Sequence, residues 1–328
     1  MEYSNLLIIT IIFALAFDFI NGFHDAANSV ATIVATQVLK PHWAVIWAAF
    51  FNFIAFMFFE LKVAATIGKG VIDPNIVDTT LILSALIGAV VWNLATWYWA
   101  LPSSSSHALI GGLVGTGIAK AGTGSLNVEG LTKIGLSIVG SPLFGLILGF
   151  ILMKLIRFLI QSYTPKKIDT WSRRFQLLSA SLYSLGHGGN DAQKTMGLIT
   201  VLLMSTGHLP GGFHTPLWVV LSCQIAMALG TLFGGWKIVK TMGMKLTKLK
   251  PLGGFCAESS GAATLFLATS LGIPVSTTHT ITGSIVGVGA ADSIKKVKWN
   301  IAGRIVWAWI FTIPAAAAIS AVSYLILK

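Results

Sequence analysis

The sequence predicts an all-α polytopic membrane protein made of two inverted repeats with re-entrant hairpins and interrupted helices. Of its 328 residues, 55% are hydrophobic and only 10% are charged, whereas a soluble domain carries about 25% charged residues. The apolar stretches are too long and continuous to be the short alternating strands of a transmembrane barrel. Related polar motifs occur in the same order in both halves, which indicates an internal repeat.

Eight apolar blocks, four in each half, are the candidates for membrane segments. They cover residues 6–38, 43–66, 79–119, 134–160, 175–206, 214–238, 255–290 and 301–327. A basic linker at 161–174 separates a first repeat at 1–160 from a second repeat at 175–328.

Two pairs of polar motifs carry the repeat. The segment from Asn21 to Ser29 aligns with the segment from His187 to Thr195, and this alignment places Asp25 on Asp191. The second pair consists of 102–107, Pro-Ser-Ser-Ser-Ser-His, and 274–279, Pro-Val-Ser-Thr-Thr-His. Agreement at both motifs, in the same order and at similar offsets, excludes chance similarity.

We expect each of these motifs to interrupt a helix. The Asp motifs lie within blocks 6–38 and 175–206, and the Pro-Ser-His motifs lie within blocks 79–119 and 255–290. After Pro102 only about 13 apolar residues remain, which reach ~20 Å as a helix, whereas the hydrocarbon core is ~30 Å thick. Blocks 79–119 and 255–290 are therefore predicted to be re-entrant hairpins that enter from opposite faces and meet near the midplane.

The net charge of +11 is interpreted as a topology signal, not as a sign of nucleic-acid binding. Lysine and arginine gather in segments 154–174, 237–250 and 291–304. The positive-inside rule places these segments in the cytoplasm, and both chain termini then lie outside. Each half crosses the membrane an odd number of times, which makes the repeats inverted and is typical of secondary transporters.

The hydroxyl-rich motifs predict an anion site. Each follows a proline and precedes a helix, whose N-terminal amides favour negative charge. Two such ends that face each other suit a tetrahedral oxyanion, although simple helix capping is the alternative. The candidate residues are Ser104, Ser105, Ser106, Ser276, Thr277 and Thr278.

The Asp motifs predict a cation site, because carboxylates and amides supply hard oxygen ligands. The candidate ligands are Asp25, Asn28, Asn190, Asp191 and Glu258, which is a further acid within an apolar block. They suit Na⁺, and the carboxylates suit H⁺ equally well. The alternatives are a structural role for the aspartates and an ion pair between Glu258 and a lysine. Lys194 is expected to neutralise Asp191 or to hold an anion.

Four histidines stand beside these motifs, where we expect them to orient the polar segments or to confer proton sensitivity. They are His24, His107, His187 and His279. A zinc site is disfavoured, because the two cysteines are not positioned to join them.

Two other classes of function are alternatives to a transporter. A passive anion channel needs no paired carboxylates within the membrane. An intramembrane hydrolase is disfavoured, because adjacent Ser106 and His107 do not readily face each other and no Gly-x-Ser-x-Gly motif occurs. We therefore predict a transporter without enzymatic activity.

At the motifs 22–29, 102–107, 189–197 and 274–279 the chain resembles the inorganic phosphate transporter (PiT) family, and the resemblance covers essentially the whole chain. It implies uptake of phosphate by symport with Na⁺ or H⁺, in the plasma membrane, with Na⁺ favoured and no other cofactor. It also implies assembly as a homodimer. Gln193 and Thr195 of the second Asp motif are further candidate phosphate ligands. Some relatives carry sulfate, so a sulfate or other oxyanion permease of the same fold is the alternative. His24 departs from the asparagine that many members have.

Overall fold

The computed structural model describes residues 4–328, and the secondary-structure elements in this part of the chain are all helices. The six helices of the first half are α1 (Asn5–Ala35), α2 (Pro41–Ile54), α3 (Lys62–Gly70), α4 (Thr79–Tyr98), α5 (Ser105–Ala121) and α6 (Val128–Ile160). Those of the second half are α7 (Pro165–Ser205), α8 (Leu217–Phe233), α9 (Trp236–Lys240), α10 (Pro251–Ser270), α11 (Thr277–Asp292) and α12 (Trp299–Leu327). A π-helical turn, Thr241–Lys245, follows α9.

The apolar content makes this chain a multi-pass membrane protein. Within residues 4–328, four helices are long and apolar enough to cross a membrane, namely α1, α4, α6 and α12. Two further spans are possible if the bent pairs α2–α3 and α8–α9 each count as one. The first pair bends by 84° and the second by 61°.

The interruptions do not all lie where the sequence predicts them. α1 and α7 pass through their Asp motifs as unbroken helices, so the expected interruption of blocks 6–38 and 175–206 is wrong. The breaks in the neighbouring blocks fall at residues 55–61 and at Gly234–Gly235, where Gly234 has a φ of 64°. A left-handed residue ends α8 there, because glycine adopts this conformation without a steric penalty.

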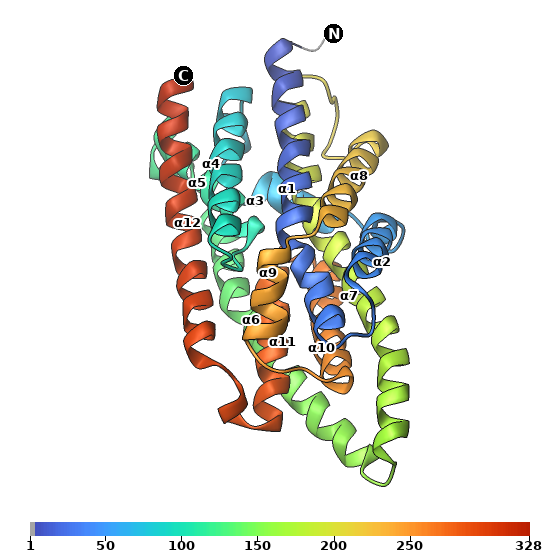
Figure 1. Ribbon diagram of the computed structural model, residues 1–328. Coiled ribbons are helices and arrows are strands. Elements are labelled where there is room, and N and C mark those ends of the chain that lie inside the picture. Colours follow the sequence, from blue (N-terminus) through green and yellow to red (C-terminus); the bar gives the residue numbers. More distant parts are fainter. Residues whose placement is uncertain (1–3) are drawn as a thin grey trace.

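The two predicted hairpins are present. α4 and α5 are joined by residues 99–104, α10 and α11 are joined by residues 271–276, and the helices of each pair pack against each other. Figure 1 shows α1 descending from the N-terminal end and α7 rising from the turn at 161–164. The start of α1 and the end of α12 lie at the end of the molecule that is opposite this turn. α7 begins at Pro165, so most of the predicted basic linker is helical.

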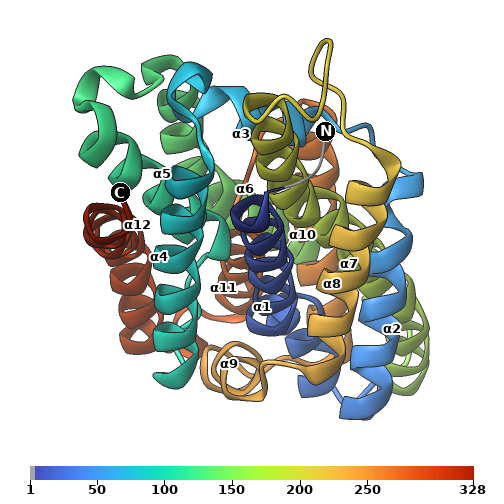
Figure 2. The same cartoon turned by 90° about the horizontal axis from the view of Figure 1, so that it is seen from above.

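The second helix of each hairpin packs closely on the last helix of the other half. α5 packs on α12, and α11 packs on α6. A Cβ added at Gly115 would lie 2.1 Å from the carbonyl oxygen of Ala317, and a Cβ added at Gly287 would lie 2.1 Å from that of Leu146. Glycine is therefore needed at both contacts, because the backbones touch directly. Figure 2 shows α12 and α2 on opposite sides of the molecule, with α1 between them.

Candidate functional site

The Asp motifs of α1 and α7 meet in the interior. Ligand atoms of Asp25, His187 and Asp191 all lie within 4.8 Å of one another, and all three side chains are buried. His24 Nδ1 lies 2.7 Å from Asp25 Oδ1, and His187 Nε2 lies 3.3 Å from Asp191 Oδ2. This arrangement of carboxylates and imidazoles has the chemistry of a cation site.

Lys194 is the positive charge of this cluster. Its Nζ lies 2.5 Å from Asp191 Oδ1, 2.5 Å from Ser106 Oγ and 2.8 Å from the carbonyl oxygen of Val275. The side chain is only 2% exposed. One ammonium group therefore joins α7 to the tips of both hairpins, because Ser106 lies in the first turn of α5 and Val275 lies in the turn before α11.

The second hairpin tip is attached to both aspartate helices. Asn28 Nδ2 donates to Thr277 Oγ1 at 3.1 Å and to Thr278 Oγ1 at 2.9 Å. The Thr277 hydroxyl donates to Asp191 Oδ2 at 2.8 Å, and the Thr278 hydroxyl reaches Asp25 Oδ1 at 3.5 Å. The predicted anion tip and the predicted cation motifs are therefore one continuous polar network.

Ser104 and Ser276, which are aligned in the two hydroxyl-rich motifs, each cap a helix. Ser104 Oγ accepts from the His107 amide at 3.3 Å, and Ser276 Oγ accepts from the His279 amide at 3.2 Å. Within residues 4–328, the buried Ser105 hydroxyl has no hydrogen-bond partner. The capping interactions fix the direction in which the amides of α5 and α11 point.

The two hairpin tips touch through their histidines. The rings of His107 and His279 meet edge to face with centroids 4.6 Å apart, and His279 stacks on Trp309 at 3.7 Å. His279 Nδ1 lies 3.4 Å from the carbonyl oxygen of Ile138. These two histidines act as packing residues between the tips, whereas His24 and His187 contact the carboxylates.

Three further predicted residues lie on α7, namely Gln193, Asn190 and Thr195. Gln193 Oε1 accepts from the amides of Val63 and Ala64 at 3.0 and 3.2 Å, so Gln193 caps the start of α3. Asn190 Nδ2 donates to Thr269 Oγ1 at 2.9 Å and thereby holds the turn of the second hairpin.

Thr195 is the third of these residues. It is fully buried, and its hydroxyl has no hydrogen-bond partner in the described part of the chain. It lies beside Asp18, whose carboxylate is also buried and equally lacks a partner there. Asp18 precedes Asp25 by two helical turns on α1, and this spacing is the signal that would have grouped it with the site.

Glu258 belongs to a separate polar cluster. Its carboxylate accepts hydrogen bonds from Thr32 at 2.6 Å, from Gln176 at 3.0 Å and from Ser179 at 2.5 Å. These hydroxyl and amide donors, and not a lysine, surround Glu258 in the described structure. Sequence reasoning missed the three partners, although Thr32 follows Asn28 by one helical turn on α1.

Comparison with known proteins shows the family of this chain. The profile of the phosphate transporter family matches residues 21–320. A protein of Rhizobium meliloti described as a probable low-affinity inorganic phosphate transporter is 61% identical over 97% of this chain and 96% of its own length. A protein of Bacillus subtilis with the same description is 46% identical over 98% and 97%.

A solved structure has the same fold as this chain. It is described as the sodium-dependent phosphate transporter, and it matches with a TM-score of 0.89 and 28% identity over 99% of both chains. The chain is thus a transport protein and not an enzyme, and it belongs to the phosphate transporter family.

Proposed function

We propose that this chain takes up inorganic phosphate across the cell membrane by symport with Na⁺, through alternating access of one central site. The observation that carries the proposal is the network in which Lys194, Thr277 and Thr278 connect the hairpin tips to Asp25 and Asp191. A structural relative that is described as sodium-dependent supports Na⁺ as the coupling ion.

The charges of the site give a physical reason for coupling. Asp25 and Asp191 bring two negative charges, and Lys194 brings one positive charge, within one buried cluster. An anion that enters this cluster meets net repulsion, and repulsion is strong where water is excluded. Na⁺ bound by the carboxylates and the Asn28 amide oxygen would neutralise the net charge of the cluster and remove this repulsion, so that phosphate binds well only after the cation.

Phosphate would then bind between the hairpin tips. Ser105, Ser106, Thr277 and Thr278 offer hydroxyl donors there, and the amides that begin α5 and α11 offer further donors. Na⁺ beside Asp191 competes with the Lys194 ammonium for the carboxylate. The ammonium would then be free to bind the anion, so that Lys194 couples the binding of the cation to the binding of phosphate.

Glu258 would hold a second coupling ion, because three neutral donors leave its negative charge uncompensated within its own cluster. Proton coupling is the second candidate, and His24 and His187 favour it because each contacts one of the two central carboxylates. In either case we propose that the basic segments face the cytoplasm, that both termini lie outside and that the protein forms a homodimer.

The test is uptake of radiolabelled phosphate into proteoliposomes under imposed gradients. Uptake that follows the Na⁺ gradient and is not inhibited by sulfate supports the proposal. Uptake that follows only the pH gradient makes H⁺ the coupling ion, and inhibition by sulfate makes the protein a broader oxyanion permease. A failure to accumulate phosphate against its own gradient would make the protein a passive channel.

A further inference from the structure

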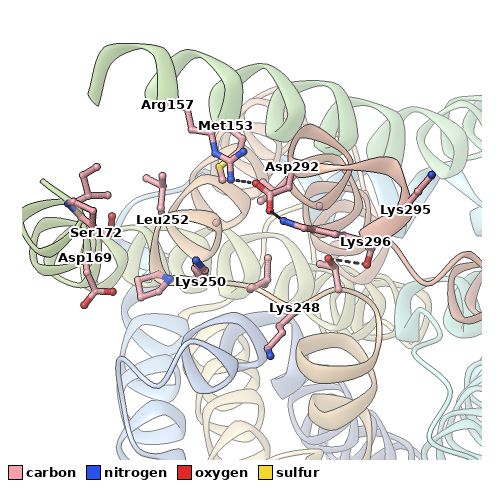
Figure 3. A pocket seen from close by; sticks show the side chains of 18 of the residues that line it. Met153, Arg157, Asp169, Ser172, Lys248, Lys250, Leu252, Asp292, Lys295 and Lys296 are labelled. Carbon is pink, nitrogen blue, oxygen red and sulfur yellow. Dashed lines mark hydrogen bonds and ion pairs between the residues drawn. The ribbon is translucent and has the colours of Figure 1, made fainter. Parts of the chain in front are cut away.

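The three basic segments of the sequence come together at one end of the molecule, where they enclose a pocket with a volume of about 740 Å³ (Figure 3). The pocket lies between the end of α6, the start of α7, the segment before α10 and the end of α11. Asp25, Asp191 and the two hairpin tips do not line it.

The lining of this pocket is strongly cationic. Its basic residues are Arg157, Lys248, Lys250, Lys295, Lys296 and Lys298, and its acidic residues are Asp169 and Asp292. Both acids are already paired. Asp292 contacts Arg157 and Lys296, as Figure 3 shows, and Asp169 contacts Arg173 at 2.8 Å.

Four lysines are therefore left without an acidic partner among residues 4–328: Lys248, Lys250, Lys295 and Lys298. The positive end of α10 adds to their field. Lys250 is the N-cap residue of this 20-residue helix, its side chain makes no capping hydrogen bond, and Pro251 and Gly253 of the first turn line the pocket. Lysines and an uncapped helix start together favour a phosphate-bearing anion.

An apolar groove with a volume of about 540 Å³ continues from this pocket. The pocket and the groove share Ile168, Ser172 and Leu252. The groove contains a row of aromatic rings: Trp171 stacks on Phe175 at 5.7 Å, and Phe175 lies 5.8 Å from Phe255.

The groove also has the features of a membrane interface. Ile156 and Ile160 of the apolar helix α6 line it, together with Tyr163 and Lys167. The Lys167 ammonium lies 4.5 Å from the centre of the Tyr163 ring. Tyrosine, tryptophan and lysine are typical of the boundary between acyl chains and head groups.

We propose that this composite site binds an anionic phospholipid, with the phosphate in the lysine pocket and an acyl chain in the aromatic groove. The continuity of the two parts selects this occupant. A free phosphate ion would leave the groove unused, and a zwitterionic lipid would bring no net negative charge to the four unpaired lysines. Basic pockets between helices at the cytoplasmic side are the sites that anionic head groups prefer. The bound lipid connects α6 and α7 to the start of α10 and the end of α11.

The experiment compares ligands on the delipidated full-length protein in detergent. Dioleoyl phosphatidylglycerol is expected to raise the melting temperature by several degrees, saturably, whereas dioleoyl phosphatidylcholine and inorganic phosphate have no such effect at the basic pocket. A short-chain phosphatidylglycerol is expected to bind at least tenfold more weakly, because it cannot fill the groove.

Two matched variants test the location. The first replaces Lys248, Lys250, Lys295 and Lys298 by glutamine and should lower the affinity for phosphatidylglycerol at least tenfold. The second replaces Lys154, Lys166, Lys240 and Lys245, which are exposed and do not line the pocket, and should keep the affinity. Both variants lose the same charge, so an equal loss of affinity in both would overturn the proposal.

Three other results would also overturn it. An equal shift with inorganic phosphate in the wild type, lost in the first variant alone, would make the pocket a vestibule for free anions. An equal shift with phosphatidylcholine would reduce the effect to general lipid solvation. A change from monomer to dimer that abolishes lipid binding would identify the groove as an interface between copies of this chain.

Discussion

Asp191 and Lys194, one turn apart on α7, form an ion pair at 2.5 Å that is almost completely buried. Removal of one partner from such a pair leaves an uncompensated charge and destabilises a protein by about 3–5 kcal/mol. We expect Lys194→Met to abolish phosphate uptake and to lower the melting temperature clearly. Uptake in proteoliposomes and thermal unfolding in detergent provide the two measurements.

The double variant with Asp191→Asn and Lys194→Met separates stability from function. It removes both charges, so the melting temperature should recover most of its loss while uptake stays absent. Lys133→Met serves as the control, because Lys133 forms an exposed pair with Glu129. Normal uptake by the single Lys194 variant would contradict the role proposed for the ammonium.

Asn28→Ala should weaken the binding of phosphate. It removes the amide that donates to the hydroxyls of Thr277 and Thr278, and an unmade buried hydrogen bond costs about 1–3 kcal/mol. We expect the KM for phosphate to rise about tenfold, which corresponds to ~1.4 kcal/mol. Initial uptake rates at saturating Na⁺ provide the test, with exposed Asn300→Ala as the control. An unchanged KM would show that the second hairpin tip does not depend on α1.

Glu258→Gln should change the response to sodium more than the response to phosphate. The substitution removes the charge of a carboxylate that only neutral donors surround. We expect the Na⁺ concentration for half-maximal uptake to rise at least tenfold. Glu60→Gln provides the comparison, because Glu60 is exposed and pairs with Lys62. A Na⁺ titration equal to that of the wild type would remove Glu258 from the coupling sites.

Gly145→Ala should destabilise the contact between α6 and α11. A Cβ at Gly145 would lie 2.4 Å from the carbonyl oxygen of Thr280, and relief of such overpacking costs about 1–3 kcal/mol. Gly140 on the same helix has nothing within 4 Å of its Cβ position, so Gly140→Ala should stabilise the helix by about 0.5–1 kcal/mol. The two melting temperatures should therefore move in opposite directions. If both substitutions moved the melting temperature in the same direction, the close packing of Gly145 against α11 would be contradicted.

The hairpins could be predicted from the sequence because their signals are local. Proline followed by hydroxyl residues ends one helix and caps the next, and the capping bonds of Ser104 and Ser276 are those that the motif predicts. The meeting of the two tips followed from the repeat, and the contact between His107 and His279 agrees with it.

The continuous course of α1 and α7 could not be predicted, because it depends on distant partners. Asn28 remains within a helix because Thr277 and Thr278 satisfy its amide, and these residues are 249 and 250 positions away. The sequence likewise suggests that Gln193 is a site residue. In the structure its side chain accepts a hydrogen bond from the start of α3, which is 130 positions away along the chain. Local patterns contain no information about such pairings.

The glycine contacts of α5 with α12 and of α11 with α6 bear on whether the halves are separable. Each half lends its last helix to the hairpin of the other, and at Gly115 and Gly287 the fit leaves no room for even a methyl group. A half produced alone would expose the glycine face of its hairpin, and its long last helix would have no hairpin to pack against. Its packing would be completed only by association with a complementary half. Split at the turn 161–164, the protein would therefore behave as two obligate partners and not as two autonomous domains.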